Sequence, residues 1–250
     1  MTRLYTPTPL SLNTEIELPE EAAHHFIKVL RARVGDKVCL FNGEGGEYHG
    51  QLSRTDKRHA YVTLEQFIEN NKSSPLKVHL GQVLSKGDRF DYAIQKATEL
   101  GVSEITPLIS ERCEVRLGNE RLDKKMAHWQ GVAISACEQS GLNIVPKINS
   151  PQTIETWTAN TQADLCFVLA PSVTGLPNPS QKPQTIAVLI GAEGGLSERE
   201  INQSMEQGFA PWCLGQRVLR TETAPVAVLS VLNWLWGDFN PPTTTVLKAP

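Results

Sequence analysis

The chain has 250 residues, of which 40% are hydrophobic and 20% charged, and this composition excludes a wholly disordered protein. Its 24 basic and 27 acidic residues give a net charge of -3, which excludes a protein that binds nucleic acid through a uniformly basic surface. Any contact with a nucleic acid must therefore come from a local basic patch. The length corresponds to one or two domains, with two slightly favoured.

The five cysteines are widely spaced and include no Cys-x-x-Cys pair, which argues against a disulfide framework and a structural zinc site. We expect them to be reduced, as in the cytoplasm. Residues 1–12 lack the apolar core of a secretory signal, and the densest apolar stretch, 226–236, is too short to span a bilayer. We therefore expect a cytoplasmic protein without a membrane segment or a metal site.

Residues 1–72 are predicted to form a small β-barrel with one helix. Three runs have the composition of strands: Lys37–Phe41, Glu47–Leu52 and Ala60–Leu64. The Asn42-Gly43 pair between the first two runs is typical of a hairpin. A helix is predicted to begin at Pro19, because apolar residues recur at helical spacing after it.

The polar segment 69–75 is the predicted linker, and strands and helices alternate after it. The predicted strands are 76–84, 105–109, 165–169, 186–190 and 212–214, and the predicted helices are 88–100, 120–140, 197–207 and 226–236. The runs 165–169 and 186–190 are continuously apolar, as in strands that are buried on both faces of a parallel sheet. Residues 73–250 are therefore predicted to form an α/β domain.

A glycine-rich segment, Gly191-Ala-Glu-Gly-Gly195, stands between a predicted buried strand and a helix that Ser197 and Glu200 open as a capping box. Glycines let the backbone approach a ligand closely, and ligands bind at the carboxyl ends of parallel strands. The spacing matches neither a P-loop nor a dinucleotide fingerprint, so it indicates another ligand. The alternative is a tight turn that binds nothing.

A second polar segment, residues 215–225, carries Arg217, Arg220 and Glu222 between two predicted buried elements. Arginines in such a loop are suited to gripping an anion such as an RNA phosphate. The alternative is a solvated loop with one structural ion pair. Thr223 is predicted to cap the last helix, which begins near Pro225.

Several motifs occur in order along the chain: Leu30–Asp36 after His24-His25, Ser85–Phe90, Gln95–Val102, Arg112-Cys113, Glu138–Gly141, Gly191–Gly195 and Leu219–Ala224. Together they resemble the ribosomal RNA small subunit methyltransferase E family, bacterial members of the SPOUT methyltransferases. The resemblance covers nearly the whole chain. This sequence departs from the family at Ala192, where proline is common, and at Leu142, where an arginine is common; the second change puts the local RNA contact in doubt.

The resemblance implies an α/β catalytic domain with a C-terminal trefoil knot, preceded by a PUA-like barrel that helps hold RNA. It also implies a homodimer with the knot region in its interface. The implied methyl donor is S-adenosylmethionine, and the implied product is N3-methyluridine in 16S rRNA of the small ribosomal subunit. Three alternatives stay open: a methyltransferase of this class with another RNA substrate, a non-catalytic RNA-binding protein, and a nucleotide- or NAD-dependent enzyme.

By resemblance, three loops supply the cofactor site. The expected cofactor-binding residues are Leu169, Ala170, Pro171, Ile190, Gly191, Glu193, Gly194, Gly195, Leu214, Gly215, Val218, Leu219, Thr221, Thr223 and Ala224. Arg220 is the candidate for stabilising negative charge on the uracil carbonyls, and Glu222 for accepting the proton of N3 or orienting the base. The alternative for Glu222 is to cap the last helix or to pair with Arg217.

Six basic residues are predicted to contact RNA: Arg3, Arg31 and Arg33 in the first domain, and Lys86, Arg89 and Arg112 in the second. Arg31-Ala-Arg33 is the densest basic cluster of the first domain, and its alternative role is a solvated helix end. The low positive charge suggests that the assembled small subunit, rather than naked RNA, is the substrate. His24 and His25 point to different faces of their helix, so we do not expect them to bind a metal.

Overall fold

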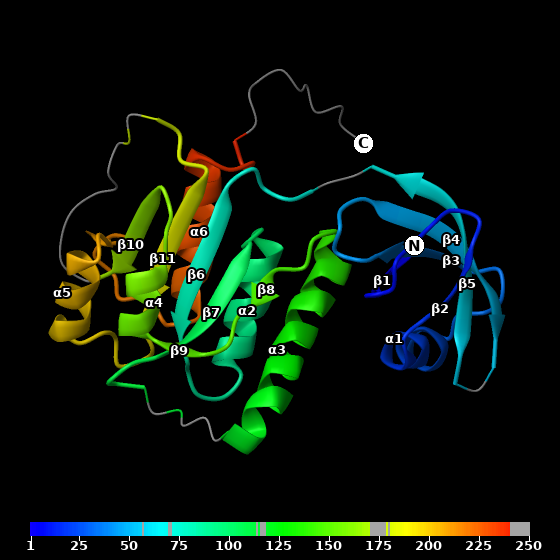
Figure 1. The fold of residues 1–250 in the computed structure, drawn as a ribbon, viewed down its shortest axis with the longest axis horizontal. Coiled ribbons are helices and arrows are strands. Elements are labelled where there is room, and N and C mark those ends of the chain that lie inside the picture. The colour runs from blue at the N-terminus through cyan, green and yellow to red at the C-terminus, as the bar shows by residue number, and fades with distance from the viewer. Residues whose placement is uncertain are drawn as a thin grey trace. The chain divides into compact units, whose positions relative to one another are not determined.

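A computed structural model describes residues 1–56, 58–69, 72–113, 115, 119–170, 179 and 181–240 (Figure 1). The chain divides into two compact units. The first comprises Met1–Ser73 together with Ile134–Val145, and the second comprises Ser74–Ala133 and Pro146–Pro250. The sequence predicted a division after residue 72 but placed 134–145 in the second domain, whereas in the structure this segment packs with the first unit. None of the helices in the described part of the chain is both long enough and apolar enough to cross a membrane.

The first unit contains a five-stranded sheet in the order β1-β3-β4-β5-β2. Its strands are β1 (Thr2–Tyr5), β2 (Glu15–Glu17), β3 (Lys37–Phe41), β4 (Glu47–Thr55) and β5 (Ala60–Ile68). Strands β3 and β4 form the predicted hairpin, with Val38 opposite Gly50, and β1 joins β3 in parallel. The hairpin confirms the Asn-Gly signal, whereas the short strands β1 and β2 carry no pattern that predicts them.

The predicted helix of the first unit is present in two parts, α1 (Glu20–His24) and the π-helix η1 (His25–Val29). Phe26 and Ala23 are fully buried in an apolar core with side chains from the strands, among them Leu4, Leu40 and Val62. The last turns of the long helix α3 (Asn119–Ser140) also belong to this unit. There Cys137 and Leu142 pack on Phe41 of β3, so the residues after α3 complete the packing around this strand.

The second unit is built on a seven-stranded sheet in which β12, β10, β11, β6, β7 and β8 are successive neighbours and β9 also pairs with β7. Every pairing is parallel, which confirms the predicted α/β class. Its strands are β6 (Lys77–Val83), β7 (Glu104–Ile109), β8 (Lys147–Ile148), β9 (Gln152–Thr153), β10 (Leu165–Leu169), β11 (Thr185–Ile190) and β12 (Ala210–Trp212). Strand β12 ends at Trp212, so Cys213 and Leu214, which were predicted to lie in it, belong to the following loop.

Besides α3, four helices accompany this sheet: α2 (Arg89–Glu99), α4 (Ile154–Asn160), α5 (Glu198–Glu206) and α6 (Thr223–Leu235) (Figure 1). Helix α2 packs on α6, and α4 packs on α5. The Ser197–Glu200 capping box opens α5 as predicted. The prediction that Thr223 caps α6 is wrong, because Thr223 is the first residue of that helix and Glu222 holds the N-cap position.

The central strand β6 and helix α4 come into unusually close contact. A Cβ atom on Gly81 would lie 2.6 Å from the indole of Trp157, so this position accepts only glycine unless the tryptophan moves. Two residues before Gly81 on β6, His79 accepts at Nε2 from the Nε1–H of Trp157 (3.1 Å). The same Nε2 lies 2.7 Å from Oγ1 of Thr106. Because Nε2 acts as the acceptor for Trp157, the neutral ring carries its proton on Nδ1.

The half-buried imidazole of His79 makes the stability of the second unit depend on pH. Burial lowers the pKa of His79, although Glu104 opposes this effect by favouring the charged ring. The unfolded chain therefore binds more protons than the folded chain below the unfolded pKa of about 6.5, and stability is lost as the pH falls through this range. We expect the free energy of unfolding to drop between pH 7.5 and 5.5, and to drop less in His79→Gln. Equal pH slopes in urea denaturation of the two proteins would contradict this assignment.

Candidate active site

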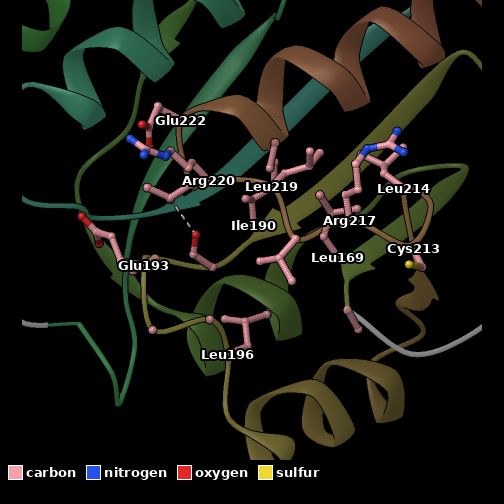
Figure 2. Close-up of a pocket in the computed structure, with 18 of the residues that line it drawn as sticks. Leu169, Ile190, Glu193, Leu196, Cys213, Leu214, Arg217, Leu219, Arg220 and Glu222 are labelled. Atoms are coloured by element: carbon pink, nitrogen blue, oxygen red, sulfur yellow. Dashed lines mark hydrogen bonds between the residues drawn. The ribbon is translucent and has the colours of Figure 1, made fainter.

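One cavity of the second unit lies where three neighbouring parallel strands end. It has a volume of about 690 Å³ and is lined by residues from the loops after β10, β11 and β12 (Figure 2). These strands are adjacent in the order β12-β10-β11, so their carboxyl ends converge at one edge of the sheet. This is the edge at which open parallel sheets bind ligands.

The residues expected to bind a cofactor line this cavity, apart from two. Those that line it are Leu169, Ala170, Ile190, Gly191, Glu193, Gly194, Gly195, Leu214, Gly215, Val218, Leu219, Thr221 and Ala224. Pro171 lies outside the described residues. Thr223 does not line the cavity: it begins α6 with an exposed side chain, and its contact with the cofactor stays a prediction. The candidate catalytic residues Arg220 and Glu222 line the same cavity.

Sequence reasoning missed four lining residues: Leu196, Ile201, Trp212 and Cys213. Ala192, Gln216 and Arg217 also line the cavity and lie within the loops that the resemblance indicated. Two of the missed residues, Trp212 and Ile201, belong to β12 and α5, whose apolar residues indicate packing rather than a binding site. The position of Trp212 at the carboxyl end of a parallel strand is the one signal that points to it. Figure 2 shows Arg217 near Leu214 and Cys213 at one end of the cavity, and Arg220 with Glu222 at the other.

The glycine loop after β11 folds back on itself. Ala192 and Gly195 form an isolated antiparallel bridge, and Gly195 has a positive φ of 67°. A Cβ atom on Gly191 would lie 3.0 Å from the carbonyl carbon of Gly195 and 3.1 Å from the nitrogen of Leu196. A side chain at Gly191 would therefore press on the backbone of Gly195 and Leu196, so the closed form of this loop favours glycine here.

A buried hydrogen-bond network ties two of the three loops to the centre of the sheet. The hydroxyl of Thr221 donates to the carbonyl oxygen of Gly191 (2.8 Å), and the amide of Gln82 donates to Thr221 Oγ1 (3.1 Å). Gln82 is 1% exposed and lies on β6 opposite Ile190 of β11. The segment before α6 is thus held against the glycine loop by three residues from three different elements.

Two arginines hold the other side of the glycine loop. Nη1 of Arg89 lies 2.6 Å from Oε1 of Glu193. Nη1 of Arg112 donates to the carbonyl oxygens of Gly194 (3.0 Å) and Leu196 (3.2 Å). Both arginines line the cavity, whereas the side chain of Lys86, the third basic residue predicted here, does not.

Glu222 has an unusual position at the edge of the cavity. Its Oε2 is buried and, within the described part of the chain, has no hydrogen-bond partner. Its side chain makes no capping bond to α6, and the described residues include no ion pair between it and Arg217. Both alternatives weighed for this residue are therefore absent from the described structure, and a buried acceptor oxygen is left without a hydrogen-bond donor among the described residues.

In the first unit, the structure separates the predicted RNA contacts into two kinds. Arg31 and Arg33 are exposed in the segment after η1, and Arg31 has a positive φ of 56°. Arg3 is only 15% exposed, and it donates to Glu47, to Oδ1 of Asn143 (2.6 Å) and to the carbonyl oxygen of Leu142 (3.2 Å). The guanidinium of Arg3 thus has its partners inside the unit, and its contact with RNA stays a prediction.

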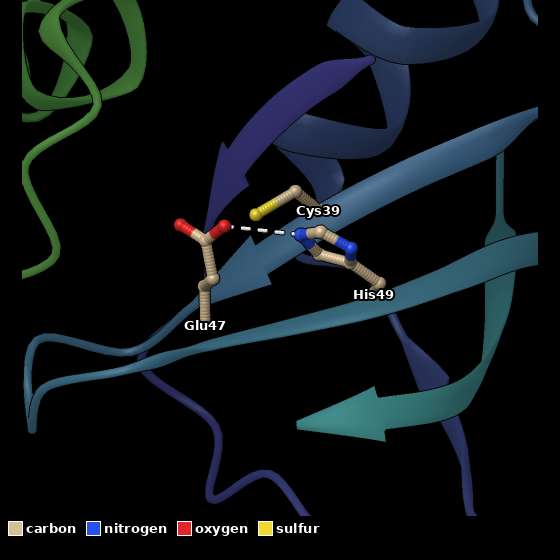
Figure 3. Close-up of side chains that lie close together, drawn as sticks. All are labelled: Cys39, Glu47 and His49. Atoms are coloured by element: carbon tan, nitrogen blue, oxygen red, sulfur yellow. Dashed lines mark hydrogen bonds and ion pairs between the residues drawn. The ribbon is translucent and has the colours of Figure 1, made fainter. Parts of the chain in front are cut away.

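The same arginine contacts the described cluster of potential metal ligands, Cys39, Glu47 and His49 (Figure 3). One ligand atom from each lies within 4.8 Å of the others. Arg3 Nη1 lies 3.2 Å from Sγ of Cys39 and pairs with Glu47, while His49 Nε2 lies 3.0 Å from the other carboxylate oxygen. Burial raises the pKa of the Cys39 thiol to about 11. The thiol is then protonated at neutral pH, and the arginine already provides the positive charge beside Glu47, so we assign no metal to this cluster.

Comparisons with known proteins agree over most of the chain. Residues 72–233 match the family model described as an RNA methyltransferase domain, and residues 18–65 match the RNA methyltransferase PUA domain. The ribosomal RNA small subunit methyltransferase E of Buchnera aphidicola subsp. Schizaphis graminum is 36% identical over 240 residues, which are 95% of this chain and 98% of that protein.

Two solved structures are also similar over nearly their full lengths. A Legionella pneumophila protein described as a methyltransferase, in complex with the bound cofactor SAM, has a TM-score of 0.92 and 40% identity, and the match covers 95% of this chain and 98% of that one. A ribosomal RNA small subunit methyltransferase E from Neisseria gonorrhoeae, bound to S-adenosyl methionine, has a TM-score of 0.89 and 36% identity. The match covers 96% of this chain and 99% of that one.

The network around Thr221 predicts a measurable loss of stability. Thr221→Val keeps the shape of the side chain but leaves the Gln82 amide and the Gly191 carbonyl without their shared partner. We expect the free energy of unfolding to fall by about 1–3 kcal/mol in denaturant titrations. Thr223→Val is the matched control, since this exposed hydroxyl makes no described hydrogen bond, and we expect a change within about 0.5 kcal/mol. Equal effects of the two substitutions would contradict the role given to Thr221.

Proposed function

Because this chain belongs to the ribosomal RNA small subunit methyltransferase E family, with a PUA-like N-terminal domain and a parallel-sheet α/β methyltransferase fold, we propose that it methylates N3 of a specific uridine in 16S rRNA, using S-adenosylmethionine. The observation that carries this proposal is the cavity at the ends of β10, β11 and β12, with the unpartnered carboxylate oxygen of Glu222 at its edge.

The residues of the cavity fit this cofactor. Its volume of about 690 Å³ is in the usual range for small-molecule sites. Leu169, Ile190 and Leu219 provide apolar walls for an adenine ring, and the glycine loop presents backbone rather than side chains. When bound, S-adenosylmethionine supplies a methyl group made electrophilic by the positive sulfonium. The protein's own contribution is to hold the nucleophile in line with that methyl group and to exclude water.

Glu222 and Arg220 account for the chemistry at the base. Uracil N3 carries a proton at neutral pH, and the target base must leave its stack to reach the cavity. Glu222 Oε2 accepts this proton as the N3 electron pair forms the new bond to carbon, and the electrons of the broken carbon–sulfur bond stay on sulfur. Arg220, which lines the cavity with an exposed side chain, offsets the negative charge that develops on the uracil carbonyls.

RNA binding is assigned to exposed basic residues in both units. Arg31 and Arg33 in the first unit, and Lys86, Arg89 and Arg112 in the second, are proposed to contact phosphates. Leu142 replaces the arginine that is common in the family and is buried against Phe41 and Cys137, so this position offers no cation to RNA. Since the net charge is -3, we propose that the substrate is the assembled small subunit.

The finer structural expectations also belong to this proposal. The resemblance implies that the chain between β10 and α6 forms a trefoil knot and that two copies pair through this region. The exposed apolar side chains of Trp234, Leu235 and Phe239, at and beyond the end of α6, support such pairing. The substrate and the five free cysteines are consistent with a cytoplasmic enzyme.

Glu222 can be tested as the proton acceptor. In Glu222→Gln we expect kcat to fall by about 10²–10⁴-fold, because the amide cannot take the N3 proton. Adenosylhomocysteine should bind with an unchanged Kd in isothermal titration calorimetry, since the loops that form the cofactor walls stay intact. A variant with wild-type kcat would exclude Glu222 as the base. Failure of the wild-type chain to bind adenosylhomocysteine at all would favour a non-catalytic RNA-binding protein.

The target nucleotide is tested directly in ribosomes. Methylated uridines are mapped in 16S rRNA from cells with and without this protein. We expect a single N3-methyluridine to disappear when the protein is removed and to return when the wild-type chain is supplied. An unchanged set of 16S rRNA methylations, together with a lost modification in another RNA, would place the enzyme in the same class with a different substrate.

A further inference from the structure

Glu193 is a carboxylate of the glycine loop that is held like a bound anion. A single oxygen, Oε1, accepts from Nη1 of Arg89 (2.6 Å) and from the backbone N–H of Lys86 (3.3 Å). The hydrogen bonds from its own backbone, from Arg89 and from Lys86 lower the pKa of Glu193 and outweigh the opposing effect of burial. The group is therefore charged at neutral pH and occupies a place formed by a guanidinium and a main-chain donor.

These donors are the ones that proteins use for phosphates. Arginine and backbone N–H groups at the start of a helix are common ligands of nucleic-acid phosphates, and Lys86 and Arg89 lie just before and at the first residue of α2. Both Arg89 and Glu193 line the cavity in which the base is proposed to react. A nucleotide that enters this cavity necessarily brings a phosphate close to its mouth.

The contact that holds Glu193 is one that an incoming phosphate can replace. The side chains of Arg89 and Glu193 are 46% and 37% exposed, and exposed ion pairs of this kind contribute little to stability. The remainder of the loop has a separate anchor, because Arg112 donates to the carbonyl oxygens of Gly194 and Leu196. Glu193 is therefore free to swing away while the backbone that faces the cofactor stays in place.

We propose that Glu193 is a built-in competitor of the substrate, occupying the place of one RNA phosphate on Arg89 and the Lys86 N–H until RNA displaces it. This inference rests on the proposed RNA substrate and adds to it a defined phosphate site and an internal control of its occupancy. The competitor weakens binding of any polyanion at this point, so only an RNA that makes the remaining contacts displaces it. Glu193 thereby contributes to specificity by lowering the affinity for incorrect partners.

The test compares Glu193→Gln with Glu198→Gln, which removes the same charge from an exposed residue of α5 outside the cavity. Small ribosomal subunits from cells that lack this protein are titrated with the fluorescently labelled full chain, saturated with adenosylhomocysteine, at several KCl concentrations and constant Mg²⁺. We expect Glu193→Gln to bind two- to fivefold more tightly than wild type. In wild type, the Glu193 carboxylate that the phosphate displaces takes up a cation from solution, and this offsets the cation that the phosphate releases. Glu193→Gln has no such carboxylate, so the slope of log Kd against log salt should be greater by about one. Glu198→Gln should give a smaller gain and the wild-type slope.

A second pair of variants shows whether the gain passes through Arg89. In Arg89→Gln, which lacks the cation, adding Glu193→Gln should no longer increase affinity. Adenosylhomocysteine binding is measured separately for each variant, and every subunit titration is run well above the measured Kd, so that a change in cofactor affinity does not enter the comparison. Loss of cofactor binding would instead make Glu193 a positioning residue of the loop and overturn the proposal, as would unchanged or weaker subunit binding, or an equal gain in the Arg89→Gln background.

The failure of this inference is distinguishable from failure of the proposed function. If wild type methylates the subunits and Glu193→Gln gains no affinity, only the competitor role is wrong. If wild type neither binds nor methylates them or any other RNA, the proposed function is wrong and the inference falls with it.

Discussion

The site depends on one constraint of the sheet: β12, β10 and β11 are parallel neighbours, so three consecutive strands, which end at Leu169, Ile190 and Trp212, all end at the same edge. The loops that follow these strands have no other reason to meet. Their relative positions are then held by short polar contacts, from Thr221 and Gln82 on one side and from Arg89 and Arg112 on the other. The apolar core places the loops, and the polar contacts set their shape.

The predictable part of the molecule is the part with strong periodicity or a local rule. The apolar runs at 165–169 and 186–190, the Asn42-Gly43 hairpin and the Ser197–Glu200 box carry their structure in their own residues, and the structure confirms them. Strands β8 and β9 have two residues each and exist only because β7 pairs with them, so no local pattern marks them. The motif resemblance, rather than periodicity, predicted which loops form the cavity.

The side-chain roles were harder to predict, because they depend on partners that the chain brings from far away. Arg3 and Arg31 are equally plausible RNA ligands in sequence, yet one is enclosed by Glu47 and Asn143 while the other is exposed. Similarly, no sequence pattern predicts that Arg89 pairs with Glu193, because the two residues are about a hundred positions apart. Thr223 was misplaced by one position at a helix start, which is where boundaries are least certain.

Because residues 134–145 belong to the first unit, this unit cannot complete its packing early in synthesis. Phe41 gains its apolar partners Cys137 and Leu142, and Arg3 gains Asn143, only from residues that are synthesised some seventy positions after the end of β5. During translation the N-terminal sheet therefore emerges with one flank uncovered and is completed only when the whole of α3 has left the ribosome. A fragment that stops at Ser73 lacks these residues, so it contains only part of the packing that surrounds β3 in the first unit.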